Sequence, residues 1–100
     1  TERFEEALAL IEKALVLLPG GPYVLDSLGW VHYRRGNLKL ALEYLTLAMD
    51  QQPDAEIAAH LGEVLWHLGD KAEAILAWED GKSNDSDNPV LIETLRKFGQ

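Results

Sequence analysis

Residues 26–53 read DSLGWVHYRRGNLKLALEYLTLAMDQQP and contain two helix-length runs of mixed apolar and polar residues. Gly36 and Asn37 separate the two runs, and Pro53 follows the second run. Glycine takes the left-handed conformation that ends many helices, asparagine is a good N-cap residue, and proline does not continue a helix interior. The stretch therefore predicts a helical hairpin that ends at Pro53.

The same pattern recurs along the chain with a period of 34 or 33 residues. The longer period pairs Ala7 with Ala41, Ala14 with Ala48 and Pro19 with Pro53, and the shorter period pairs Leu28-Gly29 with Leu61-Gly62, Gly36 with Gly69 and Ala41 with Ala74. One turn between hairpins has lost a residue, because Gly29 follows Pro19 by ten positions but Gly62 follows Pro53 by nine. This spacing is typical of helical hairpins stacked into a solenoid.

Apolar periodicity and turn residues set the bounds of the expected helices. We expect an all-α fold with helices over 3–18, 22–35, 38–52, 55–68, 71–80 and 88–98. Asp70 and Glu73 are expected to form a capping box, and Gly81 is expected to end the helix that they begin. The polar segment KSNDSDN, residues 82–88, is expected to link that helix to the last one.

One hundred residues suffice for a single domain with one hydrophobic core. Its expected parts are the second helix of a truncated hairpin at 3–18, complete hairpins at 22–53 and 54–81, and a C-terminal capping helix at 88–98. The chain begins with Thr1 instead of methionine, so we expect a fragment of a longer protein. The alternative role of the last helix is docking to a partner, because its apolar residues gather on one side.

The composition excludes several classes of function. With 17 acidic residues, 9 basic residues and a net charge of −8, the chain lacks the basic stripe that binds phosphates, so we expect no nucleic-acid partner. The chain has no cysteine. It also has no apolar run near the roughly 20 residues of a membrane-spanning helix. No serine, glycine or carboxylate pattern resembles a catalytic motif, so we expect neither an enzyme nor a cofactor.

His60, Glu63 and His67 are the group of residues that suggests a metal ion. The two histidines lie about 10 Å apart along a helix, so one ion would need a ligand from another element. We therefore expect no metal site, with one histidine at a helix contact and the other at the rim of a surface.

The small and turn residues of the chain resemble the signature of the tetratricopeptide repeat family. They are Leu28-Gly29, Gly36, Ala41, Ala48 and Pro53. In that family the small residues let paired helices approach and the proline ends the hairpin, so the resemblance implies an α-solenoid. The chain departs from the family where Trp and Tyr often stand in the first helix, because Leu25 and His32 occupy those places.

The phrases DSLGWVHYRRGNLKLALEYL and AEIAAHLGEVLWHLGD also look like the C-terminal repeats of proteobacterial envelope proteins of this family. These include outer-membrane lipoproteins that act as adaptors for a carboxyl-terminal processing protease. That likeness implies a periplasmic or outer-membrane-associated location, with the cytoplasm as the alternative.

In this family the first helix of each hairpin lines a concave surface that binds a protein or peptide. The resemblance places eight side chains on that surface: Tyr23, Asp26, Trp30, Tyr33, Arg34, Glu63, Trp66 and His67. The spacing agrees, since positions 23, 26, 30 and 33 follow one another at three- and four-residue steps. Leu25, Leu28 and His32 share the adjacent core face.

The charges of this surface indicate the kind of partner. Some members of the family clamp a terminal carboxylate, but Asp26 and Trp30 stand where that clamp would have Lys and Asn. Together with Glu56 and Glu63, Asp26 is expected to favour a neutral or basic segment, with Arg34 as the local exception.

Two alternatives stay open at this point. Trp30 and Trp66 either contact a partner or pack between neighbouring hairpins, whereas Trp78, on a second helix, is expected in the core. The whole chain either binds a partner or forms a structural end cap or self-association segment of a longer solenoid whose binding site lies upstream. In the second case the helix at 3–18 is expected to support a homodimer through its uncovered apolar face.

Overall fold

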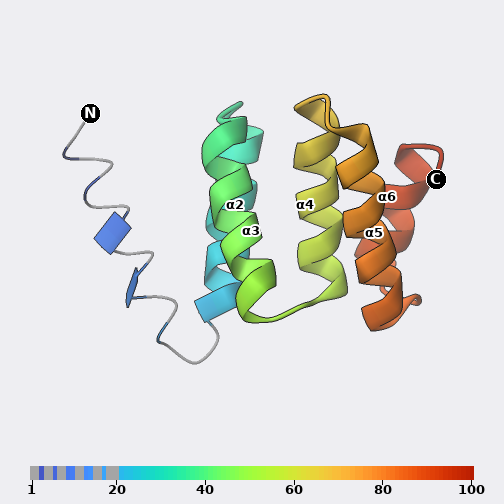
Figure 1. Cartoon of the computed structure of the whole chain (residues 1–100), viewed down its shortest axis with the longest axis horizontal. Helices are drawn as coiled ribbons and strands as arrows, with labels where there is room; N and C mark the ends of the chain where they lie inside the picture. The colour runs from blue at the N-terminus through green and yellow to red at the C-terminus, as the bar shows by residue number, and fades with distance from the viewer. Residues whose placement is uncertain (1–2, 4–5, 7–8, 11–12, 15–16, 18–20) are drawn as a thin grey trace.

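The structure is a computed structural model that describes residues 3, 6, 9–10, 13–14, 17 and 21–100. The described residues form five helices, α2 (Gly21–Arg34), α3 (Leu38–Gln51), α4 (Ala55–His67), α5 (Lys71–Asp85) and α6 (Pro89–Lys97) (Figure 1). The helix predicted over 3–18, and the homodimer through it, fall mostly on residues outside these ranges and stay predictions.

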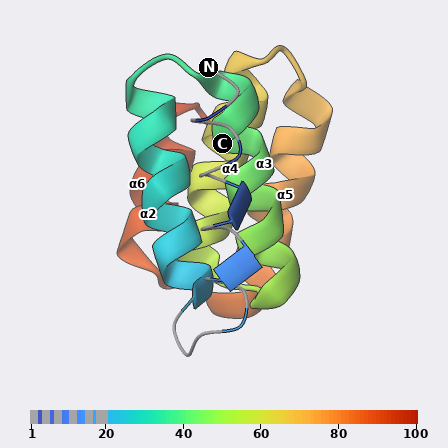
Figure 2. The same ribbon diagram turned by 90° about the vertical axis from the view of Figure 1, so that its left-hand side faces the viewer.

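The helices pack as antiparallel hairpins, so the all-helical prediction is confirmed. α2 packs against α3 and α4 packs against α5, while α4 also contacts α2 on one side and α6 on the other. The first helices of the hairpins therefore form one layer, α2, α4 and α6, and the second helices α3 and α5 form another (Figure 2). We call these the first-helix layer and the second-helix layer.

Glycines end the first helix of each hairpin as expected. Gly36 has φ 85° and Gly69 has φ 92°, a region that other residues rarely adopt. Asp70 precedes α5, but the predicted capping box with Glu73 is wrong, because the Asp70 side chain makes no capping hydrogen bond. Its φ of −90° and ψ of 62° differ from the extended backbone of a capping residue.

The helices that follow a longer turn have true caps. Asp54 has an extended backbone and its Oδ1 accepts hydrogen bonds from the N–H groups of Glu56 (2.8 Å) and Ile57 (3.1 Å). Asn88 likewise accepts from the N–H of Leu91 at 3.1 Å, just before the first-turn proline of α6. Asn88 follows Asp54 by 34 residues, so α6 begins where the first helix of a further hairpin would begin.

The largest departure from the expected helix bounds is in α5, which does not end at Gly81 but continues to Asp85. The predicted boundary of the second hairpin at residue 81 therefore falls inside a helix. A Cβ at Gly81 would lie 2.9 Å from Ala58 Cβ and 3.2 Å from Leu91 Cδ2, so the glycine allows α4, α5 and α6 to approach closely. Residues 82–85 are polar because they are exposed on a helix.

The remaining described helices agree with the predicted bounds to within one residue at either end. The predicted core face of α2 is also confirmed, since Leu25 and His32 are buried and Leu28 is half-buried. Trp78 is 1% exposed, which confirms its predicted core position.

The packing of α4 against α5 centres on Gly62 and Trp78. A Cβ at Gly62 would overlap the indole ring of Trp78, so the ring lies directly on the backbone of α4. The indole N–H donates a hydrogen bond to the Ala59 carbonyl at 3.2 Å, which pairs its polar atom in the core. Leu91 of α6 completes the same cluster.

We predict that Gly62→Ala destabilises the chain by roughly 1–3 kcal/mol or more, because the added methyl group overpacks the core. At an exposed helix position the same change would stabilise the chain by up to about 1 kcal/mol. The sign of the change in unfolding free energy therefore distinguishes a close contact at Gly62 from an open helix surface. Urea unfolding followed by circular dichroism measures the effect. In a Trp78→Leu background the space is vacated and Gly62→Ala should cost much less. An equal cost in both backgrounds would contradict the assignment.

We also predict that the chain loses stability as the pH falls below about 6.5, partly through His32. His32 stacks on Tyr44 with ring centroids 5.6 Å apart, and its burial, together with the charge of Arg35, lowers its pKa. The unfolded chain therefore binds a proton before the folded chain does, and stability rises with pH through this range. His32→Phe should show a shallower loss of unfolding free energy between about pH 7.5 and about pH 5.5, and equal slopes would argue against this role for His32.

Candidate functional site

All eight predicted partner-binding residues lie on α2 and α4, in the first-helix layer, but their exposure differs. Tyr23, Arg34 and His67 are exposed. Trp30, Tyr33 and Trp66 are half-buried. Asp26 and Glu63 are each 4% exposed. The prediction that these residues contact a partner stays a prediction, but the two carboxylates need an internal explanation, because buried charges are rarely left without a partner.

Asp26 is held in the contact between α2 and α4. His60 Nδ1 donates a hydrogen bond to Asp26 Oδ1 at 2.7 Å. The Trp30 ring covers the His60 ring, with centroids 4.0 Å apart and planes 23° apart, and it also stacks on Tyr33 at 4.6 Å. Trp30 therefore packs between neighbouring hairpins, and the part of its surface that remains exposed has a fixed orientation.

Glu63 joins three helices. Its Oε2 accepts a hydrogen bond from the Tyr33 hydroxyl of α2 at 2.7 Å and another from Lys97 Nζ of α6 at 3.2 Å. Burial, the hydrogen bond to Glu63 and the charge of Glu63 all raise the pKa of Tyr33. The tyrosine is therefore neutral over the ordinary pH range and acts as a donor.

These contacts correct the expected acidic character of the surface. Asp26 and Glu63 are not presented to solvent as free carboxylates, because each accepts hydrogen bonds from a neighbouring helix. Glu56, the third expected acid, is half-buried in the first turn of α4. The sequence predicts these acids on the exposed concave surface, but Asp26 and Glu63 are buried because their hydrogen-bond donors stand on neighbouring helices.

The second aromatic group lies where α4 meets α6. The Trp66 ring lies 5.4 Å from the Phe98 ring and 5.8 Å from the Trp78 ring, measured between centroids. Lys71 Nζ sits 4.9 Å above Trp66, and the exposed His67 meets Phe98 edge-on at 5.7 Å. Trp66 thus combines packing with a partly exposed ring.

A shallow hollow of about 370 Å³ lies between α4 and α6. Its lining comes from Glu63, Pro89, Val90, Glu93, Thr94 and Lys97. The sequence analysis assigns the last helix to capping, with docking to a partner as the alternative, and it names none of these α6 residues as site residues. The available signal was the 34-residue offset, which relates Lys97 to Glu63 as it relates Asn88 to Asp54.

The two histidines considered as metal ligands lie in different surroundings. His60 is in the contact between α2 and α4, and His67 is exposed at the rim. Within the residues that the structure describes, His, Asp and Glu side chains do not gather in a group of three that could hold a metal ion. In the same part of the chain, no helix has the length and apolar character needed to cross a membrane.

Comparison with known proteins now gives the family. A model described as tetratricopeptide repeat matches residues 1–56 and, in a second overlapping match, residues 27–89. The chain belongs to the tetratricopeptide repeat family. Repeats of this family are generally protein–protein interaction modules and are typically non-catalytic.

Two relatives carry names that state the repeat and nothing more. The TPR repeat-containing protein PA4667 of Pseudomonas aeruginosa is 52% identical over 63 residues, which are 63% of this chain and 11% of the relative. The TPR repeat-containing protein MJ1428 of Methanocaldococcus jannaschii is 32% identical over 99 residues, which are 99% of this chain and 17% of the relative. The chain thus spans a small part of either relative, and neither name is that of an enzyme.

We predict that Tyr33→Phe removes a loss of stability at high pH. Because the pKa of Tyr33 is raised in the folded chain, the stability that it contributes is present below about pH 10 and is lost as the pH rises further. Unfolding free energies at about pH 8 and about pH 10.5 should differ less in the variant than in the parent chain. Tyr23→Phe, at the exposed end of the same helix, is the matched control and should behave as the parent. Identical behaviour of all three proteins would contradict the burial of the Tyr33 phenol against Glu63.

Proposed function

We propose that this chain is a scaffold or adaptor module that binds a peptide or protein segment on its first-helix layer. One observation carries the proposal: Trp30 and Trp66 are half-buried in that layer, Trp30 by stacking on His60 and Tyr33 and Trp66 by a tilted ring contact with Phe98. Aromatic rings fixed in this way bury a large area on binding and lose little side-chain entropy.

The proposed partner is a neutral segment with an apolar anchor. Arg34 and His67 are exposed beside the tryptophans, and Lys97 is 58% exposed. The carboxylates of Asp26 and Glu63 are occupied by internal donors, so their charge attracts a basic partner less than the sequence suggests. Asp26 and Trp30 stand where a carboxylate clamp would have Lys and Asn. Their presence argues against recognition of a C-terminal carboxylate.

The exposed Arg34 and His67 side chains give the cleanest test, because their removal keeps Trp30, Trp66 and the rings stacked on them. Arg34→Ala combined with His67→Ala should reduce retention of the partner by roughly tenfold in a quantitative pull-down from the source cell with the full-length protein. Arg35→Ala is the matched control, since Arg35 follows α2 and lies near His32 instead. Proteins retained equally by all three versions would exclude the first-helix layer as their binding surface. Thermal unfolding of each variant verifies that the fold is intact.

We further propose that the longer protein is a bacterial envelope lipoprotein that acts as an adaptor for a carboxyl-terminal processing protease. The support is the likeness of residues 26–45 and 55–70 to the C-terminal repeats of such proteins. Co-purification of the full-length protein with that class of protease from a membrane fraction tests the idea. Recovery of the full-length protein in the soluble cytoplasmic fraction would exclude it.

A second candidate is a structural end of a longer solenoid, and Arg96 favours it. In the 34-residue register Arg96 stands where Gly62 allows Trp78 to lie on α4, so a second helix could not approach α6 as closely. Under this proposal Arg34→Ala combined with His67→Ala would leave partner retention unchanged. Light scattering across concentrations would report any self-association.

A further inference from the structure

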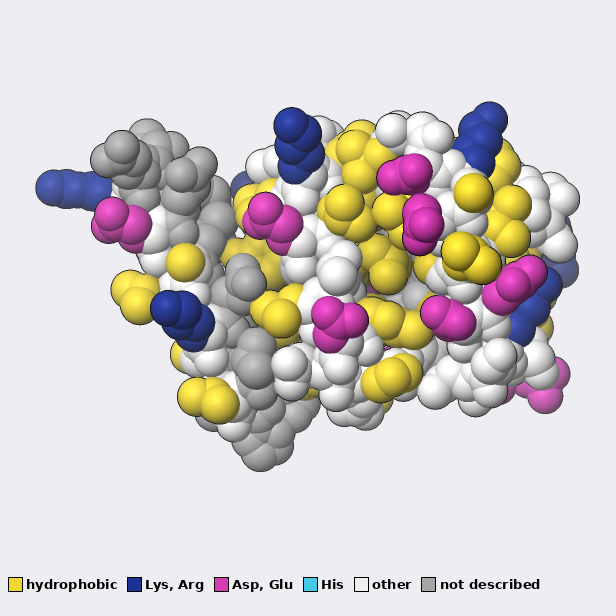
Figure 3. Space-filling view, in the orientation of Figure 1, with side chains coloured by type: hydrophobic (Ala, Val, Ile, Leu, Met, Phe, Trp, Pro, Cys, Tyr) yellow, Lys and Arg dark blue, Asp and Glu magenta, His cyan; other side chains and the backbone are white. Residues whose placement is uncertain are grey.

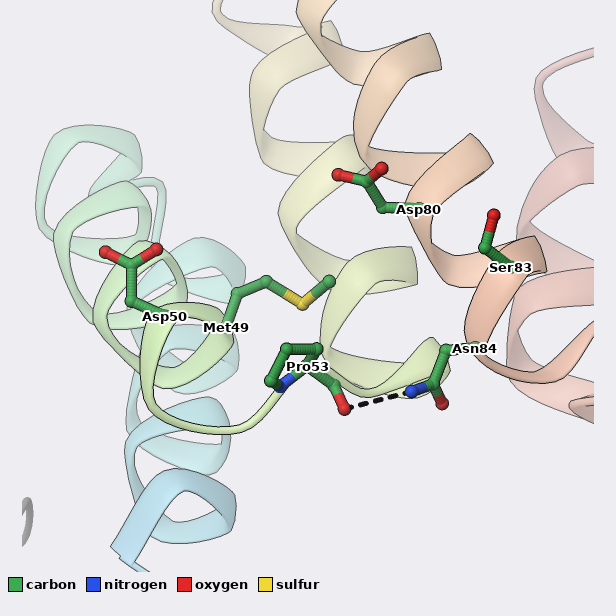
Figure 4. A pocket seen from close by; sticks show the side chains of 6 residues that line it. All are labelled: Met49, Asp50, Pro53, Asp80, Ser83 and Asn84. Atoms are coloured by element: carbon green, nitrogen blue, oxygen red, sulfur yellow. Dashed lines mark hydrogen bonds between the residues drawn. The ribbon is translucent and has the colours of Figure 1, made fainter.

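A groove on the second-helix layer lies outside the surface proposed above. It has a volume of about 540 Å³ and runs between the C-terminal halves of α3 and α5. Its lining residues are Met49, Asp50, Pro53, Asp80, Ser83 and Asn84 (Figure 4). We call it the α3–α5 groove.

The groove exists because α5 continues beyond Gly81. Ser83 and Asn84 belong to the extension, and Asn84 Nδ2 donates a hydrogen bond to the Pro53 carbonyl at 3.1 Å. This bond, drawn as a dashed line in Figure 4, ties the end of α5 to the turn before α4. The Ser83 hydroxyl donates to the Glu79 carbonyl within α5, so it is not available as a donor in the groove.

The groove combines an apolar floor with two carboxylates. Met49 and Pro53 form the apolar part, and a methionine side chain adapts readily to a bound apolar group. Asp50 on α3 and Asp80 on α5 are both exposed, and none of the described residues donates a hydrogen bond or forms an ion pair with either. Their charges are therefore available to a ligand.

The surroundings reinforce the negative potential. Figure 3 shows hydrophobic side chains gathered over the face that contains α3 and α5, with acidic side chains among them and Lys and Arg near the margins of the view. The nearest basic residue along α5 is Lys82, which is exposed, and Glu79 adds a further carboxylate beside Asp80. A groove of this kind attracts cations and repels phosphate groups and anionic lipid.

We propose that the α3–α5 groove docks an extended segment of a partner protein in which an apolar side chain stands between basic side chains. The apolar side chain contacts Met49 and Pro53, and the basic groups reach Asp50 and Asp80. A second copy of this chain is a poorer occupant, because each copy carries a net charge of −8. This surface is separate from the first-helix layer, so the two proposals stand or fall independently.

The probe for this proposal is the peptide acetyl-Gly-Lys-Leu-Leu-Lys-Gly-amide, titrated into the isotopically labelled chain and followed by NMR chemical shifts. The largest shifts are expected at Met49, Asp80 and Ser83. Asp50→Asn combined with Asp80→Asn should weaken binding roughly tenfold, as expected for two lost charge contacts. Ser83→Arg, which places a competing cation in the groove, should weaken binding at least as much.

Two controls separate a docking site from general attraction to an acidic protein. Glu73→Gln combined with Glu93→Gln changes the net charge by the same amount outside the groove and should leave binding within about twofold. The peptide with Glu in place of Lys should not bind. Thermal unfolding of each variant verifies that it is folded, which is expected because all the substituted side chains are exposed.

Each remaining outcome overturns the proposal. Equal weakening by the two charge-matched pairs would show attraction to overall charge alone. Shifts confined to α2 and α4 would assign the peptide to the first-helix layer, and no shifts at millimolar peptide would show that the groove does not bind this chemistry. Concentration-dependent light scattering that Ser83→Arg abolishes would make a second copy of the chain the occupant.

Discussion

The contact between the Trp78 indole and the backbone of α4 at Gly62 is the constraint on which the rest of the structure depends. A large ring can reach the backbone only where a Cβ is missing, and its N–H then finds the Ala59 carbonyl in an otherwise apolar core. This contact fixes the distance between α4 and α5. α6 then packs on the same cluster through Leu91, and its Phe98 ring covers Trp78 and Trp66. Gly29 plays the corresponding role in the preceding hairpin, where a Cβ would lie 2.8 Å from Leu45 Cγ.

Polar side chains on the first-helix layer fix the position of one hairpin relative to the next. Apolar contacts set the distance within a hairpin, whereas Asp26, Glu63 and their donors connect successive first helices. A buried carboxylate that accepts good hydrogen bonds is tolerated and specifies one arrangement of its neighbours. The aromatic rings on this layer are therefore held in fixed orientations, which favours the proposed binding because little would remain to be ordered.

Much of the fold could be predicted from the sequence, because each feature was encoded locally. Gly36 and Gly69 mark the turns, the repeated small residues mark the close contacts, and the apolar period marks the helix faces. Gly81 was misread because a glycine at a close contact and a glycine at a helix end look the same in a sequence. Only the position of Ala58 and Leu91 around it distinguishes the two. The family resemblance and the helical spacing suggest the candidate surface. They do not reveal the pairing of Glu63 with Tyr33 and Lys97, because it joins residues 30 and 34 positions away and depends on how the hairpins stack.

The two faces of the stack also differ in how they resist bending. On one face Glu63 ties α2 and α6 to α4 through a single carboxylate oxygen, so spreading these helices would break two hydrogen bonds to a buried charge. On the other face the groove leaves α3 and α5 apart along part of their length, with one exposed hydrogen bond at its end. We therefore expect the tied face to act as the hinge line of the solenoid, so that a change in curvature narrows or widens the space between the second helices.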